Sequence, residues 1–190
     1  GIIKTAILVG YMAAISLLPD IRRVFEYHGA EHKAIFTHEK GLPLTVENAR
    51  LQSRFHPRCG TSFLLIVILV AIALFAAVLR GQLSEVAAVD HLLKILLKIP
   101  LMFPIAGLAY EAIKLSGRTY ARSRLARALA APGMWLQRIT TREPSDEQLE
   151  IALISIRKTL WRERVTTAGA ISSCTVAVYA SAKEIDLPLA

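Results

Sequence analysis

A short histidine motif is the part of this sequence with the clearest chemical potential. Residues 26–33 read Glu-Tyr-His-Gly-Ala-Glu-His-Lys, so His28, Glu31 and His32 follow the H-x-x-E-H spacing of the inverted zinc-hydrolase motif. On a helix, imidazoles four residues apart share one face and can bind one metal ion. The carboxylate between them can accept a proton from an activated water. We therefore expect His28 and His32 to bind a divalent metal, with zinc the expected ion, and Glu31 to act as general base.

Three further residues are candidates to complete the metal shell: His56, Cys59 and Glu111. His56 and Cys59 share the turn His-Pro-Arg-Cys-Gly, which would place Cys59 at a helix N-terminus, where a thiolate is favoured. Glu111 follows an apolar segment and needs a partner there, because a lone charge near hydrocarbon is costly.

Less specific interpretations of these residues stay open. The histidines would suit a polar membrane interface, and Cys59 would suit an ordinary turn. Glu111 would suit an ion pair with Arg22, Arg23 or Lys114. Cys59 acting as a nucleophile with His56 as base is a weaker hypothesis, because their spacing across a proline does not ensure contact.

The composition indicates a membrane protein. The 190 residues are 54% hydrophobic, with mean hydropathy +0.44 and net charge +8. This is too apolar for an ordinary soluble domain and too charged for membrane spans alone. Residues 60–79 carry no charge and match the roughly 20 residues that a helix needs to cross a bilayer. We expect an all-α polytopic membrane protein with about three transmembrane helices and amphipathic cytosolic helices.

The expected organisation follows the alternation of apolar and basic segments. Transmembrane segments are expected at 1–19, 60–79 and 91–115, a His-rich loop at 20–59, basic amphipathic helices at 116–164, and a tail without an assigned role at 165–190. The first segment is short, and the initial Gly in place of Met favours a chain that continues upstream. Lys and Arg are frequent in the His-rich loop and after the third span but absent from residues 81–90, so both basic regions are expected in the cytosol. The two cysteines do not indicate a structural disulfide there.

Local signals define the expected helices more closely. The histidine motif should lie on a helix that begins after Pro19 and ends at Gly41, and Gly29 within it indicates a close approach by another helix or a substrate. Thr45 can cap a short helix that continues to Arg54. Residues 125–142 suit a helix lying in the membrane interface. Ser145 and Gln148 form a capping box that opens a last helix, whose apolar face repeats at four-three-four spacing: Leu149, Leu153, Ile156 and Leu160.

Five sequence blocks together resemble the YqhQ-like family of bacterial membrane proteins, a domain of unknown function. They are Glu-Tyr-His-Gly-Ala-Glu-His-Lys (26–33), Leu-Thr-Val-Glu-Asn-Ala-Arg (44–50), His-Pro-Arg-Cys-Gly-Thr-Ser-Phe (56–63), Ala-Gly-Leu-Ala-Tyr-Glu (106–111) and Pro-Gly-Met-Trp-Leu-Gln-Arg-Ile-Thr-Thr-Arg-Glu-Pro (132–144). The resemblance covers residues 2–160 and implies a predicted metal-dependent enzyme of the bacterial plasma membrane, without a substrate. An N-terminal Gly-Gly-Gln-Ala-Val type motif of the family is absent, and the tail after Glu163 differs. If the absent region contributes to the site, this chain is an incomplete enzyme.

Two classes of function remain after these observations. The leading hypothesis is a zinc hydrolase at the cytosolic membrane face, acting on a lipid-linked or membrane-embedded substrate. The rival is a non-catalytic membrane scaffold, with a structural metal site or polar network and amphipathic helices that recruit a membrane protein partner or a second copy. The uncharged second span argues against a metal or proton carrier. Nucleic-acid binding is disfavoured, because no aromatic-basic platform accompanies the arginines.

Overall fold

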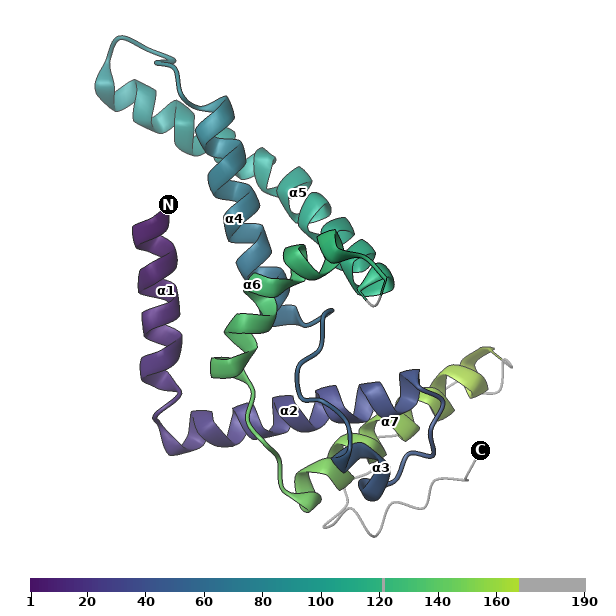
Figure 1. Cartoon of the computed structure of the whole chain (residues 1–190). Coiled ribbons are helices and arrows are strands. Elements are labelled where there is room, and N and C mark those ends of the chain that lie inside the picture. Colours follow the sequence, from purple (N-terminus) through teal and green to yellow (C-terminus); the bar gives the residue numbers. More distant parts are fainter. Residues whose placement is uncertain (121, 168–190) are drawn as a thin grey trace. The chain divides into compact units, whose positions relative to one another are not determined.

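The computed structural model describes residues 1–120 and 122–167, and every regular element in these ranges is a helix (Figure 1). The helices are α1 (Ile2–Ile15), α2 (Pro19–Glu39), α3 (Val46–Arg50), α4 (Gly60–Val78), α5 (Ala87–Thr119), α6 (Arg124–Thr140) and α7 (Asp146–Thr167). The predicted all-α class is therefore confirmed. The chain divides into a span unit, Gly1–Ile15 with Pro57–Thr140, and a histidine unit, Ser16–His56 with Thr141–Ala190.

The span unit contains the helices that can cross a bilayer. α4 and α5 are long and apolar enough to do so, and a third span results if α1 and α2, separated by a short break, count as one interrupted span. α1 alone has 14 residues, which is fewer than the roughly 20 that a bilayer requires. The protein is thus an all-helical membrane protein with two or three candidate spans.

α6 crosses one end of the α4 and α5 pair (Figure 1). Near its C-terminus, Gln137 Nε2 donates to Ser62 Oγ on the first turn of α4 at 2.8 Å. Near its N-terminus, the carbonyl of Ala126 accepts from Ser116 Oγ at the end of α5 at 2.9 Å. Buried hydroxyl and amide groups thus join α6 to the start of α4 and the end of α5.

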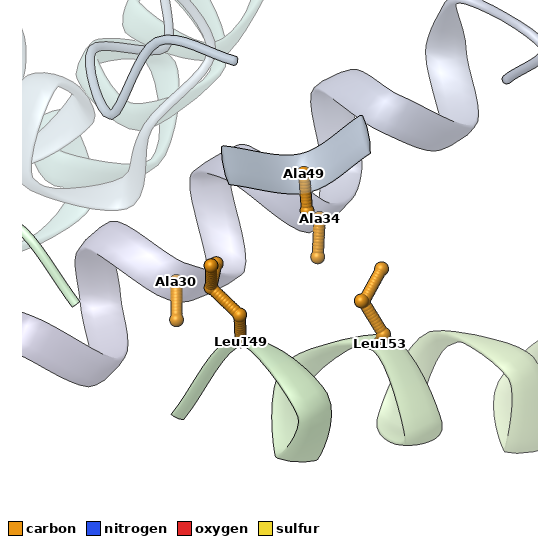
Figure 2. Packing of buried hydrophobic residues seen from close by; sticks show 5 residues of the cluster. All are labelled: Ala30, Ala34, Ala49, Leu149 and Leu153. Atoms are coloured by element: carbon orange, nitrogen blue, oxygen red, sulfur yellow. The ribbon is translucent and has the colours of Figure 1, made fainter. Parts of the chain in front are cut away.

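The histidine unit is built from α2, α3 and α7 around a small apolar core (Figure 2). Alanines on α2 and α3 face leucines on α7, and the small side chains let the helices approach closely; the core residues are Ala30, Ala34, Ala49, Leu149 and Leu153. Leu149, Leu153 and Ile156 of the predicted apolar repeat therefore pack in this core, and Leu160 is not part of it.

The two predicted helix caps are present, but the predicted end of the short helix α3 differs from the observed one. Thr45 Oγ1 accepts from the amide of Asn48 at 3.4 Å, and Ser145 and Gln148 exchange two hydrogen bonds as a capping box. α3 ends at Arg50 rather than Arg54, because residues 51–56 leave the helix and bring the carbonyl of Arg54 to His32 on α2. α7 extends to Thr167, so most of the predicted tail, with Cys174, lies outside the described residues.

Candidate metal site

Two histidines of the H-x-x-E-H motif lie side by side on α2. The ring centroids of His28 and His32 are 4.4 Å apart, and a ring nitrogen of one lies within 4.8 Å of a ring nitrogen of the other. His28 is partly buried, and His32 is only 3% exposed. The four-residue spacing therefore pairs the imidazoles on one helix face, as predicted.

His56 joins them from the irregular segment that follows α3. Its ring centroid lies 5.7 Å from that of His32 and 4.5 Å from the ring of Phe36, one turn further along α2. The side chain is buried. The histidine unit thus gathers three imidazoles, His28, His32 and His56, which we call the histidine cluster.

A backbone carbonyl determines which nitrogen of His32 is available. His32 Nδ1 lies 2.6 Å from the carbonyl oxygen of Arg54. Because a carbonyl oxygen can only accept, Nδ1 must carry the hydrogen, and the lone pair of the neutral ring is on Nε2. Metal-binding histidines usually donate their second nitrogen to a carbonyl or carboxylate in this way.

A carboxylate, rather than a carbonyl, is the acceptor that orients the ring of His56. His56 Nε2 lies 3.3 Å from Glu39 Oε2, on the last turn of α2. In the tautomer that donates to this carboxylate, the lone pair of the ring is on Nδ1. Glu39 was not predicted from the sequence. Its signal was its position seven residues after His32, two turns along the same helix face.

His28 and His32 fit a divalent metal by their donor chemistry. Two imidazoles that bind one zinc ion tetrahedrally place their ring centroids roughly 5 Å apart. The centroid separation of His28 and His32, 4.4 Å, is close to this value, and that of His32 and His56, 5.7 Å, is larger. His32 and His56 each use one nitrogen for a fixed oxygen acceptor, which is the arrangement that orients a ligand for a metal.

The two predicted carboxylates are both exposed and lie in different units. Glu31 is exposed on α2, three residues from His28. Glu111 is exposed on α5 in the span unit, and its Oε1 lies 3.3 Å from Lys114 Nζ. The ion pair with Lys114 is the alternative that the sequence left open for Glu111.

Cys59 is the N-cap residue of α4, so the predicted helix N-terminus is present. The thiol is free of any disulfide and buried, and its Sγ lies 3.1 Å from Thr61 Oγ1 on the first turn of that helix. Cys59 belongs to the span unit and is three residues from His56 along the chain.

The segment 141–144, which we call the connector, holds the histidine unit together. Arg54 Nη1 donates to the carbonyl of Thr141 at 2.5 Å, and the buried Lys33 pairs with Glu143. The predicted close approach at Gly29 is present, but the approaching group is the backbone of Arg142 in the connector rather than another helix or a substrate. The connector therefore fixes both α2 and the residue whose carbonyl orients His32.

Comparison with known proteins places the chain in a family. The sequence model described as "Protein of unknown function (DUF1385)" matches residues 1–162. The chain belongs to this family. It is 38% identical over 166 residues to "Uncharacterized protein YqhQ" of Bacillus subtilis (strain 168), an alignment that covers 87% of the chain. The chain spans about half (49%) of that relative's length. No solved structure matches.

Proposed function

We propose that this DUF1385 member is a metal-dependent hydrolase of the bacterial inner membrane, working at the cytosolic face. The observation that supports it best is the hydrogen bond from His32 Nδ1 to the Arg54 carbonyl. It selects the tautomer in which His32 Nε2 can bind a metal, beside His28 on the same helix face. A histidine pair without such an acceptor would be weaker evidence.

His28 and His32 would hold the ion, with His56 or Cys59 as third ligand. His56 is supported by its burial and by its bond to Glu39, and Cys59 by its position three residues further along the chain. Three protein ligands are typical of a catalytic zinc site, because they leave one position open. A bound zinc ion supplies Lewis acidity, which activates water near neutral pH.

Glu31 is assigned the proton transfers. Its carboxylate is exposed and follows His28 by three residues on α2, so substrate and solvent can both reach it. It would accept the proton of the attacking water at a carboxylate oxygen and return it to the leaving group. Glu111 has no part in this proposal, because it is exposed and paired with Lys114.

The substrate class follows from the chain path. His56 is four residues before Gly60, the first residue of the apolar helix α4, so their Cα atoms are at most about 15 Å apart at 3.8 Å per residue. A site tied this closely to a candidate span suits a lipid-linked or membrane-embedded substrate with its hydrolysable bond near the headgroups. The excess of Lys and Arg in the flanking loop supports the cytosolic side.

The first experiment is metal analysis of the detergent-purified protein, prepared without chelator. We expect stoichiometric zinc in the parent and its loss in the His28→Ala/His32→Ala double variant. His38→Ala is the matched control, because His38 is an exposed histidine on the same helix. A parent without metal, or a double variant that keeps it, would contradict the proposal.

Cobalt substitution separates catalysis from the rival function, a non-catalytic scaffold with a structural metal. The rival is favoured by the number of donors, since His28, His32, His56 and Cys59 together would close a four-ligand shell. A thiolate-to-cobalt absorption band that disappears in Cys59→Ser would identify Cys59 as a ligand. If His56→Asn also alters the cobalt spectrum, all four residues bind and the scaffold is supported. If only one of these variants alters it, one position stays open and screening of hydrolase substrates is justified.

A further inference from the structure

The span unit carries a strongly basic segment at one end of its apolar helices. Between Ala112 and Thr140 the sequence has six basic residues and no acidic one: Lys114, Arg118, Arg122, Arg124, Arg127 and Arg138. The segment comprises the end of α5, the link to α6 and α6 itself. Lys114 pairs with Glu111, just before the segment. The charge of the five arginines is not compensated by acidic residues of the same segment.

The contacts of α6 place this charge where the candidate spans end. Thr140 Oγ1 lies 3.3 Å from Thr61 Oγ1 on the first turn of α4, and a Cβ on Gly133 would lie 2.4 Å from Ser62 Cβ. At the other end of α6, Ser116 of α5 donates to Ala126. If α4 and α5 cross the bilayer, as their length and composition allow, α6 lies at the boundary between hydrocarbon and headgroups.

A further arginine is held at the same end. Arg58 immediately precedes the N-cap of α4, and its side chain lies along α5, where a Cβ on Gly117 would be 2.3 Å from Arg58 Cγ. Only a glycine at this position lets the arginine stem lie so close to the helix. The next residue of α5 is the exposed Arg118, so two arginines belong to this end of the helix pair.

The two faces of α6 differ in their chemistry. Small and apolar residues such as Ala126, Ala130 and Leu136 are buried. Large apolar side chains stay 48–70% exposed on the rest of the helix, namely Leu125, Leu129 and Trp135. Arg124, Arg127 and Arg138 are exposed among them. Exposed tryptophan and leucine beside arginine is the pattern of helices that lie in the plane of a membrane interface.

We propose that this surface binds the headgroups of anionic phospholipids. Arg124 and Arg127, with Arg122 just before them, pair with lipid phosphates through their planar guanidinium groups, which match phosphate geometry better than lysine does. Trp135 and the exposed leucines enter the adjacent acyl region. The binding orients the end of the span pair and does not depend on whether the histidine cluster holds a metal.

The test uses Trp135 as the reporter. In a Trp161→Phe background Trp135 is the sole tryptophan, because the chain has two. The full chain is placed in vesicles that contain brominated phosphatidylglycerol or brominated phosphatidylcholine at equal mole fraction. We expect quenching by the anionic lipid to exceed quenching by the zwitterionic lipid by about twofold or more, as local enrichment of anionic headgroups requires. Equal quenching by the two lipids would overturn the proposal.

Two double variants with the same change in net charge show whether the arginines of α6, rather than the net charge of the protein, cause the preference for anionic lipid. Arg124→Gln/Arg127→Gln should abolish the preference. Arg162→Gln/Arg164→Gln, which removes the same charge from exposed positions on α7, should keep it. A preference that survives the first change, or is lost equally with the second, would overturn the proposal. If the first variant fails to fold, the parent still provides a test, because the preference must fall as salt is raised.

Discussion

Gly29 and Arg142 touch through their backbones, although 113 positions separate them in the sequence. A Cβ on Gly29 would lie 2.0 Å from the carbonyl oxygen of Arg142. The amide of Arg142 donates to the carbonyl of Phe25 at 2.8 Å, one helical turn before Gly29. The connector therefore lies directly on the turn of α2 that begins the histidine motif.

Gly29→Ala should destabilise the histidine unit despite the better helix propensity of alanine. Alanine gains about 1 kcal/mol in a helix interior. The added methyl group would, however, meet backbone that cannot rotate away, and overpacking of this kind typically costs about 1–3 kcal/mol, occasionally more. A lower thermal midpoint in detergent, measured by circular dichroism, would report it.

Gly10→Ala is the control for this prediction, because a Cβ on Gly10 of α1 meets nothing within 4 Å. It should leave the midpoint unchanged or raise it. If the Gly29→Ala protein is as stable as the Gly10→Ala protein, the connector does not pack closely enough against α2 to exclude a methyl group.

Lys33→Met should also destabilise the histidine unit. Only 4% of the Lys33 side chain is exposed, and its Nζ donates to the carbonyl of Arg50 at 3.0 Å and pairs with Glu143. Methionine fills a similar volume but leaves the Arg50 carbonyl without this donor, at an expected cost on the order of 1–3 kcal/mol. Thermal unfolding of Lys33→Met, Glu143→Gln and the double variant measures the coupling. If the losses of stability in the two single variants simply add in the double variant, Lys33 and Glu143 do not stabilise the fold by interacting with each other.

Elements whose signals are local were predictable from the sequence. The caps at Thr45 and Ser145 involve residues within three positions, and the apolar face of α7 repeats with the helical period. α4 matches an uncharged segment of the length a bilayer requires. The pairing of His28 with His32 follows from a four-residue spacing on one helix.

Contacts made by backbone atoms were not predictable. The acceptor for His32 is the carbonyl of Arg54, and a carbonyl has the same chemistry at every residue. The glycine at position 29 indicated a close approach but could not identify Arg142 as the approaching residue. The ion pair of Glu111 is a side-chain contact, and Lys114 could be named from the sequence as a possible partner because it lies three residues away on the same helix.

The N-terminus of α3 should give the histidine unit a pH-dependent stability. The backbone amide of Glu47 and the Thr45 hydroxyl hold the pKa of the Glu47 carboxyl below its usual value of 4.5. Because the folded pKa is lowered, the stabilisation is present above pH 4.5 and is lost as the pH falls through the folded pKa.

Glu47→Gln should therefore lower the thermal midpoint slightly at pH 7 and have less effect as the pH falls below 4.5. The effect is small because the carboxylate is exposed to solvent. Thermal melts of both proteins across this range provide the measurement. A difference in midpoint that stays constant from pH 7 to the acid end would show that the carboxylate charge is not involved.

Glu39→Gln separates the role of orienting His56 from that of binding a metal. The amide is similar in size to the carboxylate and can still accept from His56 Nε2, but it lacks the charge that makes the ring a better donor to a metal. If His56 is a ligand, zinc affinity should fall by about 10- to 100-fold, the usual effect of losing such a partner. Competition with a chromophoric chelator measures the affinity.

Glu31→Gln is the informative contrast, because Glu31 is also on α2 but is assigned to proton transfer rather than to ligand orientation. It should keep the parental zinc affinity and lose turnover of any substrate found by screening. If Glu39→Gln binds zinc as tightly as the parent while Cys59→Ser does not, the third ligand is Cys59, and the bond between His56 and Glu39 serves only to hold the loop against α2.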